Sequence, residues 1–253
     1  MRSFVGDGNF KANHLKQSND DDDVWLTNGE AFMTNPARYN QHLAQAEETK
    51  TASGHFVFFH SFPLSWSFQK LTCHRHRAQL NGEAPHNSSD CSGIGGHCCA
   101  RHGCFAPSSL VNFQKGERQM NMDWSLCEAL ATTNIGQLLQ VLHIYDINCS
   151  YYKHFLERIT RNDYLWIAEH IKLLHAIGLF HVHGHKEECL YRWATSYVPG
   201  AGVIDGEILE TLWAVLNSIS STVRTASLAH RTEILDDHMN DSNFKKMLKI
   251  GEW

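Results

Sequence analysis

The chain lacks the features that mark secreted and membrane-spanning proteins. The 253-residue chain has no N-terminal segment with a charged start and an apolar core. Its longest apolar run, residues 56–66, is broken by His60 and Pro63. A bilayer-spanning helix needs about 20 apolar residues in succession. Without a secretory signal, the eight cysteines are expected to be reduced thiols or metal ligands rather than disulfides. We therefore expect a soluble intracellular protein.

An excess of basic charge is also missing. Lys and Arg number 22 against 27 Asp and Glu, which gives a formal net charge of −5. Domains that bind nucleic acid usually carry a basic surface, so the overall charge gives no support for such a partner. A hydrophobic content of 42% is ordinary for a globular domain, and the length allows one large domain or two small ones.

Hydrophobic patterning predicts an α/β architecture, because buried strands and amphipathic helices alternate in the second half. Residues 73–104, rich in Cys, His and Gly, are expected to be irregular. Asp205 is the expected N-cap of the helix that follows it. We expect helices over residues 36–49, 122–133, 151–159, 165–177, 205–219, 227–239 and 244–250, and strands at residues 4–5, 137–146 and 178–184.

Three sequence-distant segments each place carboxylates in an apolar setting. Asp7 and Asp146 follow predicted strands, and Glu207 and Glu210 lie one turn apart on a predicted helix. Buried carboxylates are costly unless a positive partner neutralises them, and Mg²⁺ prefers oxygen ligands. These side chains are therefore candidates for a metal site that cleaves phosphodiesters. A turn at Asp7, a cap at Asp146 and glutamates that complement a helix dipole are the alternative interpretation.

Long ordered motifs resemble the Kyakuja–Dileera–Zisupton (KDZ) transposases, a mostly fungal family. The resemblance implies a ribonuclease-H-like core, with a mixed sheet flanked by helices and an Asp–Asp–Glu triad. By motif, Asp7 and Asp146 are the aspartates, and the glutamate is Glu210 or Glu207. By analogy with related transposases, in which the catalytic glutamate precedes a bulky aromatic on its helix, Glu210 is favoured, since Trp213 follows it. The resembling segments are GDGNF at 6–10 and residues 99–126, 145–159, 180–217 and 225–251.

The resemblance also implies cofactors, partners and a location. Mg²⁺ or Mn²⁺ in a two-metal site would activate water to nick a transposon end, and then activate the freed 3′-hydroxyl to attack target DNA. The expected partner is DNA in the nucleus, with further copies of the chain as a second candidate and no small-molecule substrate. Residues that support the triad are expected to be His185, Cys189, Trp213 and Asn217.

The chain also departs from the family pattern. It begins at the first catalytic strand and ends soon after KKMLKIG, so we expect a single core over residues 1–253 that is a fragment, with an insertion over 17–119. Residues 51–70 are aromatic-dense and foreign in composition, and a retained intron is one hypothesis for them, which transcript sequencing would test. The alternative function is an inactive or domesticated fragment that acts as a non-enzymatic nuclear binding module.

Cysteines and histidines between the two aspartates are candidate zinc ligands, because structural zinc takes four thiolate or imidazole ligands. No repeated CxxC pair is present, so an insertion loop with scattered thiols is the alternative, and a zinc-stabilised interaction module is a third functional class. A second group, His181, His183 and His185, would share one face of a strand at 178–184, or simply form hydrogen bonds at its end. The candidate zinc ligands are Cys73, His76, Cys99, His102 and Cys104.

Four basic residues are candidates for contacts with DNA phosphates. Lys115 and Arg118 could face one another across a turn, and ordinary surface charge is the alternative for all four. The set is Arg101, Lys115, Arg118 and Arg192.

Overall fold

A computed structural model describes residues 1–17, 23–46, 89–136 and 138–250. Cys73, His76 and the segment 51–70 lie outside these described residues. None of the described helices is both long and apolar enough to cross a membrane.

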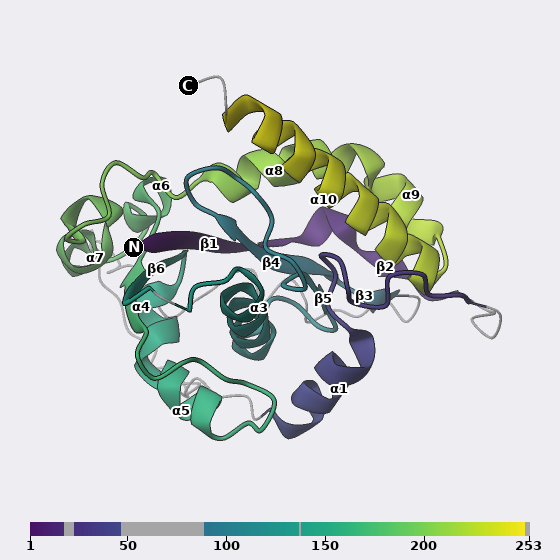
Figure 1. The fold of residues 1–253 in the computed structure, drawn as a ribbon, viewed down its shortest axis with the longest axis horizontal. Helices are drawn as coiled ribbons and strands as arrows, with labels where there is room; N and C mark the ends of the chain where they lie inside the picture. Colours follow the sequence, from purple (N-terminus) through teal and green to yellow (C-terminus); the bar gives the residue numbers. More distant parts are fainter. Residues whose placement is uncertain (18–22, 47–88, 137, 251–253) are drawn as a thin grey trace, which may run out of the picture.

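A five-stranded mixed sheet forms the centre of the molecule (Figure 1). Its strand order is β5-β4-β1-β6-β7. β1, β6 and β7 run parallel, whereas β4 is antiparallel to both β1 and β5. A separate two-stranded sheet pairs β2 with β3. The strands are β1 (Arg2–Asn9), β2 (His14–Leu15), β3 (Ser89–Cys91), β4 (Gly93–Cys99), β5 (Val111–Phe113), β6 (Gln140–Tyr145) and β7 (Lys172–Ala176).

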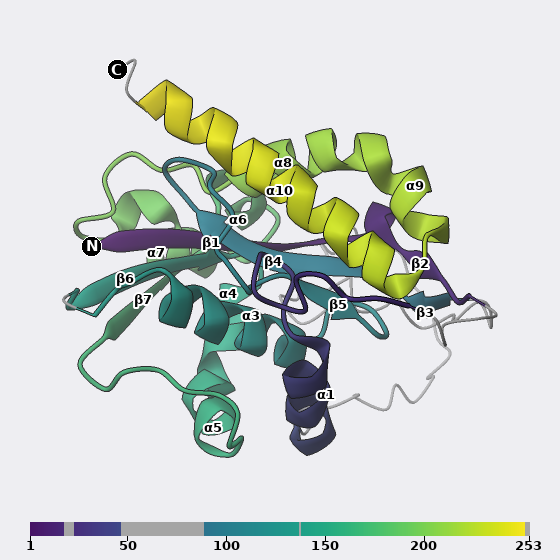
Figure 2. The ribbon, with the colours of Figure 1, turned by 45° about the vertical axis from the view of Figure 1, so that its right-hand side comes forward.

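Helices cover both faces of this sheet (Figure 2). One face carries α1 (Pro36–Gln45), α3 (Gln119–Thr132), α4 (Asn148–Tyr151) and α5 (Phe155–Thr160). The other carries α8 (Ile208–Leu216), α9 (Ser220–Thr225) and α10 (Leu228–Ile250). Two short helices, α6 (Leu179–Val182) and α7 (Glu187–Trp193), follow β7. Short 3₁₀ turns occupy Phe10–Ala12, Tyr152–His154, Thr195–Tyr197 and Asn217–Ile219.

The core is divided by the sheet, because successive strand residues point to opposite faces. Val5 packs in a cluster with Trp213 of α8 and Leu235 of α10. Its neighbour Phe4 packs on the other face with Trp124 of α3. Every second side chain of β1, counted from Val5, therefore faces α8, and Asp7 is one of them.

Sequence patterning predicted β1, β6 and most helices, but it was wrong for residues 165–184. The predicted helix over 165–177 contains β7 instead, and the predicted strand over 178–184 contains α6. β7 pairs in parallel with β6, so tertiary pairing overrides the local helical pattern. The alternation of His181, His183 and His185 therefore does not place them on one face of a strand.

Residues 89–99 were expected to be irregular but form β3 and β4. The glycines in this segment are not typical of strands, so the sequence pattern did not reveal a buried one. A Cβ at Gly95 would overlap the Phe113 ring, and one at Gly96 would lie 2.8 Å from Leu110 Cγ. The part of the expected insertion that spans β4 and β5 thus belongs to the central sheet.

Three histidines lie buried side by side across β4, β6 and β7. His97 Nε2 lies 3.1 Å from His143 Nε2, and His97 Nδ1 lies 2.7 Å from Ser125 Oγ of α3. The His143 and His175 rings meet edge to face. Burial lowers the pKa of His97 to about 3 and that of His175 to about 4, and it holds the pKa of His143 well below its usual value. The core therefore requires neutral imidazoles.

This cluster predicts acid sensitivity. In the unfolded chain each histidine gains a proton near pH 6.5, whereas the folded core resists that proton. The free energy of unfolding is therefore at its full value above about pH 6.5. Below that pH it falls toward pH 4 by up to ~1.4 kcal/mol per pH unit for each histidine. His175→Phe removes one such group at the edge of the cluster. Urea unfolding at pH 7, 6 and 5 is expected to show a shallower loss in His175→Phe than in the wild type. Replacement of the exposed His230 by Phe is the control, and equal slopes in all three proteins would contradict the account.

Candidate metal centre

Asp7 and Asp146 lie next to each other because β1 and β6 are neighbouring parallel strands. Gly6 pairs with Tyr145 in the register of these strands, so the residue after each partner falls at the same level of the sheet. Asp7 is within β1, two residues before its end, rather than after the strand. Asp146 directly follows β6. The edge at the carboxyl ends of both strands thus presents two carboxylates.

Helix α8 brings the glutamates to the same place. It packs against β1, and Trp213 Nε1 donates a hydrogen bond of 2.9 Å to Asp7 Oδ2. Glu210 lies in the first turn of α8, and Glu207 occupies the N-cap position. Asp205, the expected N-cap, instead accepts a 3.1 Å hydrogen bond from the Glu207 backbone N–H through Oδ1.

His181 of α6 joins three of these carboxylates. Its Nδ1 lies 3.1 Å from Asp146 Oδ2, and its Nε2 lies 3.2 Å from Glu207 Oε2 and 3.3 Å from Glu210 Oε1. The hydrogen bond to Glu210 raises the pKa of His181 to about 9, with further support from the charges of Asp146 and Glu207 and against the effect of burial. The imidazolium therefore supplies the positive charge within the acidic cluster. Sequence analysis placed His181 on a strand and did not connect it to the carboxylates.

The carboxylates are held close enough to oppose one another's ionisation. Burial, followed by the charges of Glu117, Asp146 and Glu210, raises the pKa of Asp7 well above its usual value. Burial also raises the pKa of Asp146 to about 7, although the charge of His181 acts in the opposite direction. Such a cluster of like charges favours binding of a cation.

Glu117 is a fifth carboxylate, which sequence analysis missed. It is 3% exposed and accepts a 2.6 Å hydrogen bond from Tyr145 Oη. Burial raises its pKa to about 7. Gly8 makes room for it, since a Cβ there would lie 2.6 Å from Glu117 Oε2. A glutamate in a polar stretch, QKGERQ, has no sequence signal that would reveal this burial.

The donor set fits a divalent cation. One ligand atom each from Asp146, His181 and Glu210 lies within 4.8 Å of the others, and the two carboxylates of this group face the imidazolium in the metal-free protein, where a cation would take over its positive charge. Glu210 Oε2 is buried and has no hydrogen-bond partner among the described residues. Burying a carboxylate oxygen without a partner is costly, and Mg²⁺ or Mn²⁺ coordination would satisfy it.

The contacts distinguish the two glutamates. Glu207 Oε1 accepts a 3.1 Å hydrogen bond from the Phe180 backbone N–H and lies against Gly178. Glu210 instead has an unsatisfied oxygen and contributes to the raised pKa of Asp7. Glu207 thus braces the start of α6, whereas Glu210 is directed to the aspartates.

Removing one charge from this cluster is expected to stabilise the metal-free protein. Because the folded pKa of Asp7 is raised, its ionised form at pH 8 destabilises the native state, and that penalty disappears at low pH. Asp7→Asn is expected to add about 1–3 kcal/mol to the free energy of unfolding at pH 8. An asparagine oxygen can still accept from Trp213.

Thermal unfolding in EDTA at pH 8 and pH 5 measures this effect. The gain should shrink at pH 5, and Mg²⁺ should stabilise the wild type more than Asp7→Asn. Asp237→Asn, at an exposed position, is the matched control. A gain in the control equal to that of Asp7→Asn would show that local charge repulsion is not the cause.

The other candidate residues lie around this centre or away from it. Asn217 Oδ1 accepts a 2.9 Å hydrogen bond from Asn9 Nδ2 and so joins the end of α8 to the end of β1. His185 and Cys189 lie with Cys149 in a separate cluster. Exposed Lys115 and half-buried Arg118 both lie in the connection between β5 and α3, whereas exposed Arg192 lies in α7. Arg101 donates a 2.8 Å hydrogen bond to the Ala201 carbonyl.

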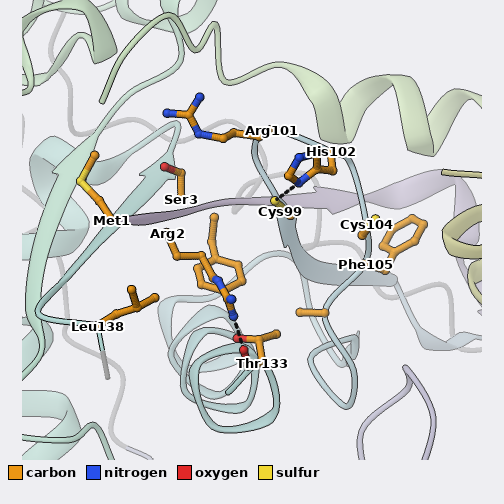
Figure 3. A pocket seen from close by; sticks show the side chains of 12 residues that line it. Met1, Arg2, Ser3, Cys99, Arg101, His102, Cys104, Phe105, Thr133 and Leu138 are labelled. Carbon is orange, nitrogen blue, oxygen red and sulfur yellow. Dashed lines mark hydrogen bonds between the residues drawn. The ribbon is translucent and has the colours of Figure 1, made fainter. Parts of the chain in front are cut away.

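The candidate zinc ligands of the β4–β5 loop are only partly gathered. Cys99 Sγ lies 3.4 Å from His102 Nδ1 beside a cavity of about 390 Å³, with Cys104 farther along the loop (Figure 3). Two groups of three metal-ligating side chains occur in the described part of the chain, and neither contains these residues. This zinc site stays a prediction.

Comparison with known proteins gives the family. The model of the Kyakuja-Dileera-Zisupton transposase family matches residues 1–243. No curated protein and no solved structure matches the chain. The family match extends over nearly all of the sequence, including both strands and the helix that carry the carboxylates. The chain therefore belongs to the Kyakuja–Dileera–Zisupton transposase family.

Proposed function

We propose that the chain is the catalytic core of a DNA transposase, which cleaves phosphodiesters and transfers strands with Asp7, Asp146 and Glu210 as metal ligands. Membership of the family suggests the transposase role. The observation that carries the catalytic assignment is the meeting of carboxylates from β1, β6 and α8. Asp146 and Glu210 each offer a ligand atom within 4.8 Å of the other. Asp7 is held against α8 by Trp213, and its pKa is raised by burial and further by the charges of Asp146 and Glu210.

The sheet supports the proposal that this is a ribonuclease-H-like core. Its central strand, β1, has parallel β6 and β7 on one side. On the other side lies β4, which is antiparallel to β1, and then β5, which is antiparallel to β4 and so runs in the direction of β1. Ligands of open α/β sheets commonly bind beyond the carboxyl ends of parallel strands. Asp146 lies at that edge and Asp7 close to it, and α8 packs against β1 beside them.

Each residue has a distinct role in this proposal. Asp7, Asp146 and Glu210 would hold Mg²⁺ or Mn²⁺, which activates the attacking oxygen and stabilises the leaving one when bound. Trp213 orients Asp7 through its N–H, and Glu207 with His181 fixes α6 against α8. In the nick, a water oxygen would attack the phosphorus and the bond from phosphorus to the 3′ oxygen would break, which leaves a 3′-hydroxyl and a 5′-phosphate. In strand transfer, this 3′-hydroxyl would attack a target phosphodiester, whose own 3′ oxygen leaves as a hydroxyl.

The expected setting follows from the reaction. DNA ends and target DNA are the partners, the nucleus is the proposed location, and assembly with further copies would bring two ends together. The net charge of −5 favours a second candidate, a non-enzymatic fragment that retains the fold. A chain with a negative net charge is less suited to holding DNA without basic partners.

Nicking of supercoiled plasmid DNA tests the proposal. The wild-type chain is expected to nick it with Mn²⁺ or Mg²⁺ and not with EDTA, and Asp146→Ala is expected to be inactive. Equal nicking by both proteins would refute the mechanism. Absence of nicking by a folded wild type that still binds the DNA would favour the non-enzymatic fragment.

A further inference from the structure

A second cluster of metal-ligating side chains lies beside the acidic one. Cys149 belongs to α4, Cys189 to α7, and His185 to the turn before α7. One ligand atom from each lies within 4.8 Å of the other two. Cys149 and Cys189 are buried, and His185 is half-buried. Three soft or borderline ligands from two distant segments thus meet at one point.

We propose that Cys149, His185 and Cys189 bind a zinc ion that fastens α4 to α7. Zinc–sulfur and zinc–nitrogen bonds of about 2.3 and 2.0–2.1 Å place tetrahedral sulfur and nitrogen ligands roughly 3.5 Å apart. Cys149 Sγ and His185 Nδ1 are 3.4 Å apart. Two thiolates and an imidazole select zinc rather than Mg²⁺, which requires oxygen ligands.

The local packing supplies a reason for such a fastening. The apolar cluster that holds this region has five buried members, and two of them are Cys149 and Cys189 themselves. The others are Ile177, Val182 and Ala194. The helices concerned have only four residues in α4 and α6 and seven in α7. Helices this short are marginal without tertiary support, and bound zinc contributes folding free energy directly.

The position of the zinc site ties it to the acidic cluster. Cys149 follows Asp146 by three residues, and His185 follows His181 by four. The same two segments therefore meet twice, once through the ion pair of Asp146 with His181 and once through the thiolate–imidazole cluster. Zinc at the second point would hold His181 and Asp146 in register. The zinc inference does not depend on whether the chain cleaves DNA.

Metal content of the purified full chain tests the inference. Cys149→Ala, His185→Ala and Cys189→Ala are each expected to contain one equivalent of zinc less than the wild type. The double variant Cys99→Ala/Cys104→Ala, which removes the other described thiols of the zinc prediction, should keep that equivalent. Cys189→His preserves a ligand and should restore zinc, which separates lost coordination from misfolding.

Two further measurements make the outcome decisive. Cobalt(II) added to the apoprotein should give the visible bands of tetrahedral thiolate coordination in the wild type and in Cys99→Ala/Cys104→Ala, but not in Cys149→Ala. Removal of zinc with a selective chelator should speed amide hydrogen exchange in residues 177–194. Unchanged zinc in the three single variants, no zinc in the wild type, or a Cys149–Cys189 disulfide in the unreduced protein would each overturn the proposal.

Discussion

Glu210→Gln is expected to lower the rate of Mn²⁺-dependent plasmid nicking by about 10³-fold, since the loss of one metal-binding carboxylate removes ~4 kcal/mol of transition-state stabilisation. Glu210 has a buried oxygen without a described partner, and it affects the ionisation of both aspartates. Its amide analogue keeps the size of the side chain but not the charge that a cation requires.

Glu207→Gln is the matched control. Glu207 lies on the same turn and also contacts His181, but one of its oxygens accepts the Phe180 N–H, a bond that a glutamine oxygen can still accept. We expect its rate to stay within about tenfold of the wild type, or ~1.4 kcal/mol. Initial rates, with circular dichroism to verify folding, distinguish the two variants. A larger loss in Glu207→Gln would exchange the roles proposed for the glutamates.

The largest effect on stability is expected at the ion pair that joins α3 to α5. Arg158 Nε and Nη2 donate to Asp123 at 2.6 and 2.9 Å, and the Asp123 side chain is 1% exposed. The guanidinium also lies 4.8 Å from the centre of the Tyr151 ring. Arg158→Met leaves a buried carboxylate without its partner, so we expect a loss of about 3–5 kcal/mol in the free energy of unfolding.

Denaturant unfolding with two further variants tests the cause of that loss. Lys245→Met breaks an exposed pair with Asp241 and should cost less than about 1 kcal/mol. The double variant Asp123→Leu/Arg158→Met removes both charges and should recover much of the stability lost in Arg158→Met. A double variant as unstable as Arg158→Met would show that packing, rather than an unpaired charge, causes the loss.

The sequence predicts the positions of the acidic residues better than their surroundings. Local periodicity predicts the apolar segments before Asp7 and Asp146 and the amphipathic pattern around Glu210. The structure has the matching elements at these places, β1, β6 and α8. Residues 165–177 were predicted as a helix but contain strand β7, and residues 178–184 were predicted as a strand but contain helix α6. Both segments have short apolar runs, and the pairing of β7 with β6 decides their structure. β4 was missed because its glycines are selected by close packing.

Long-range contacts explain the residues that sequence analysis missed. Glu117 lies in a polar stretch, and only the fold buries it beside Tyr145. His181 was placed on a strand, and its contact with Asp146 spans 35 positions. Cys149 was noticed within a motif but not as a ligand, because His185 and Cys189 approach it only after α6 and α7 have formed. No local sequence pattern predicts these long-range contacts.

Manganese in a crystal of the wild-type chain tests the central claim most directly. Anomalous scattering after a soak in MnCl₂ should show density bounded by the carboxylate oxygens of Asp7, Asp146 and Glu210, and the density should be absent in Asp146→Asn. Manganese found elsewhere, or a soaked crystal in which Asp7 and Glu210 contact no metal, would contradict the assignment of these three carboxylates as the metal centre.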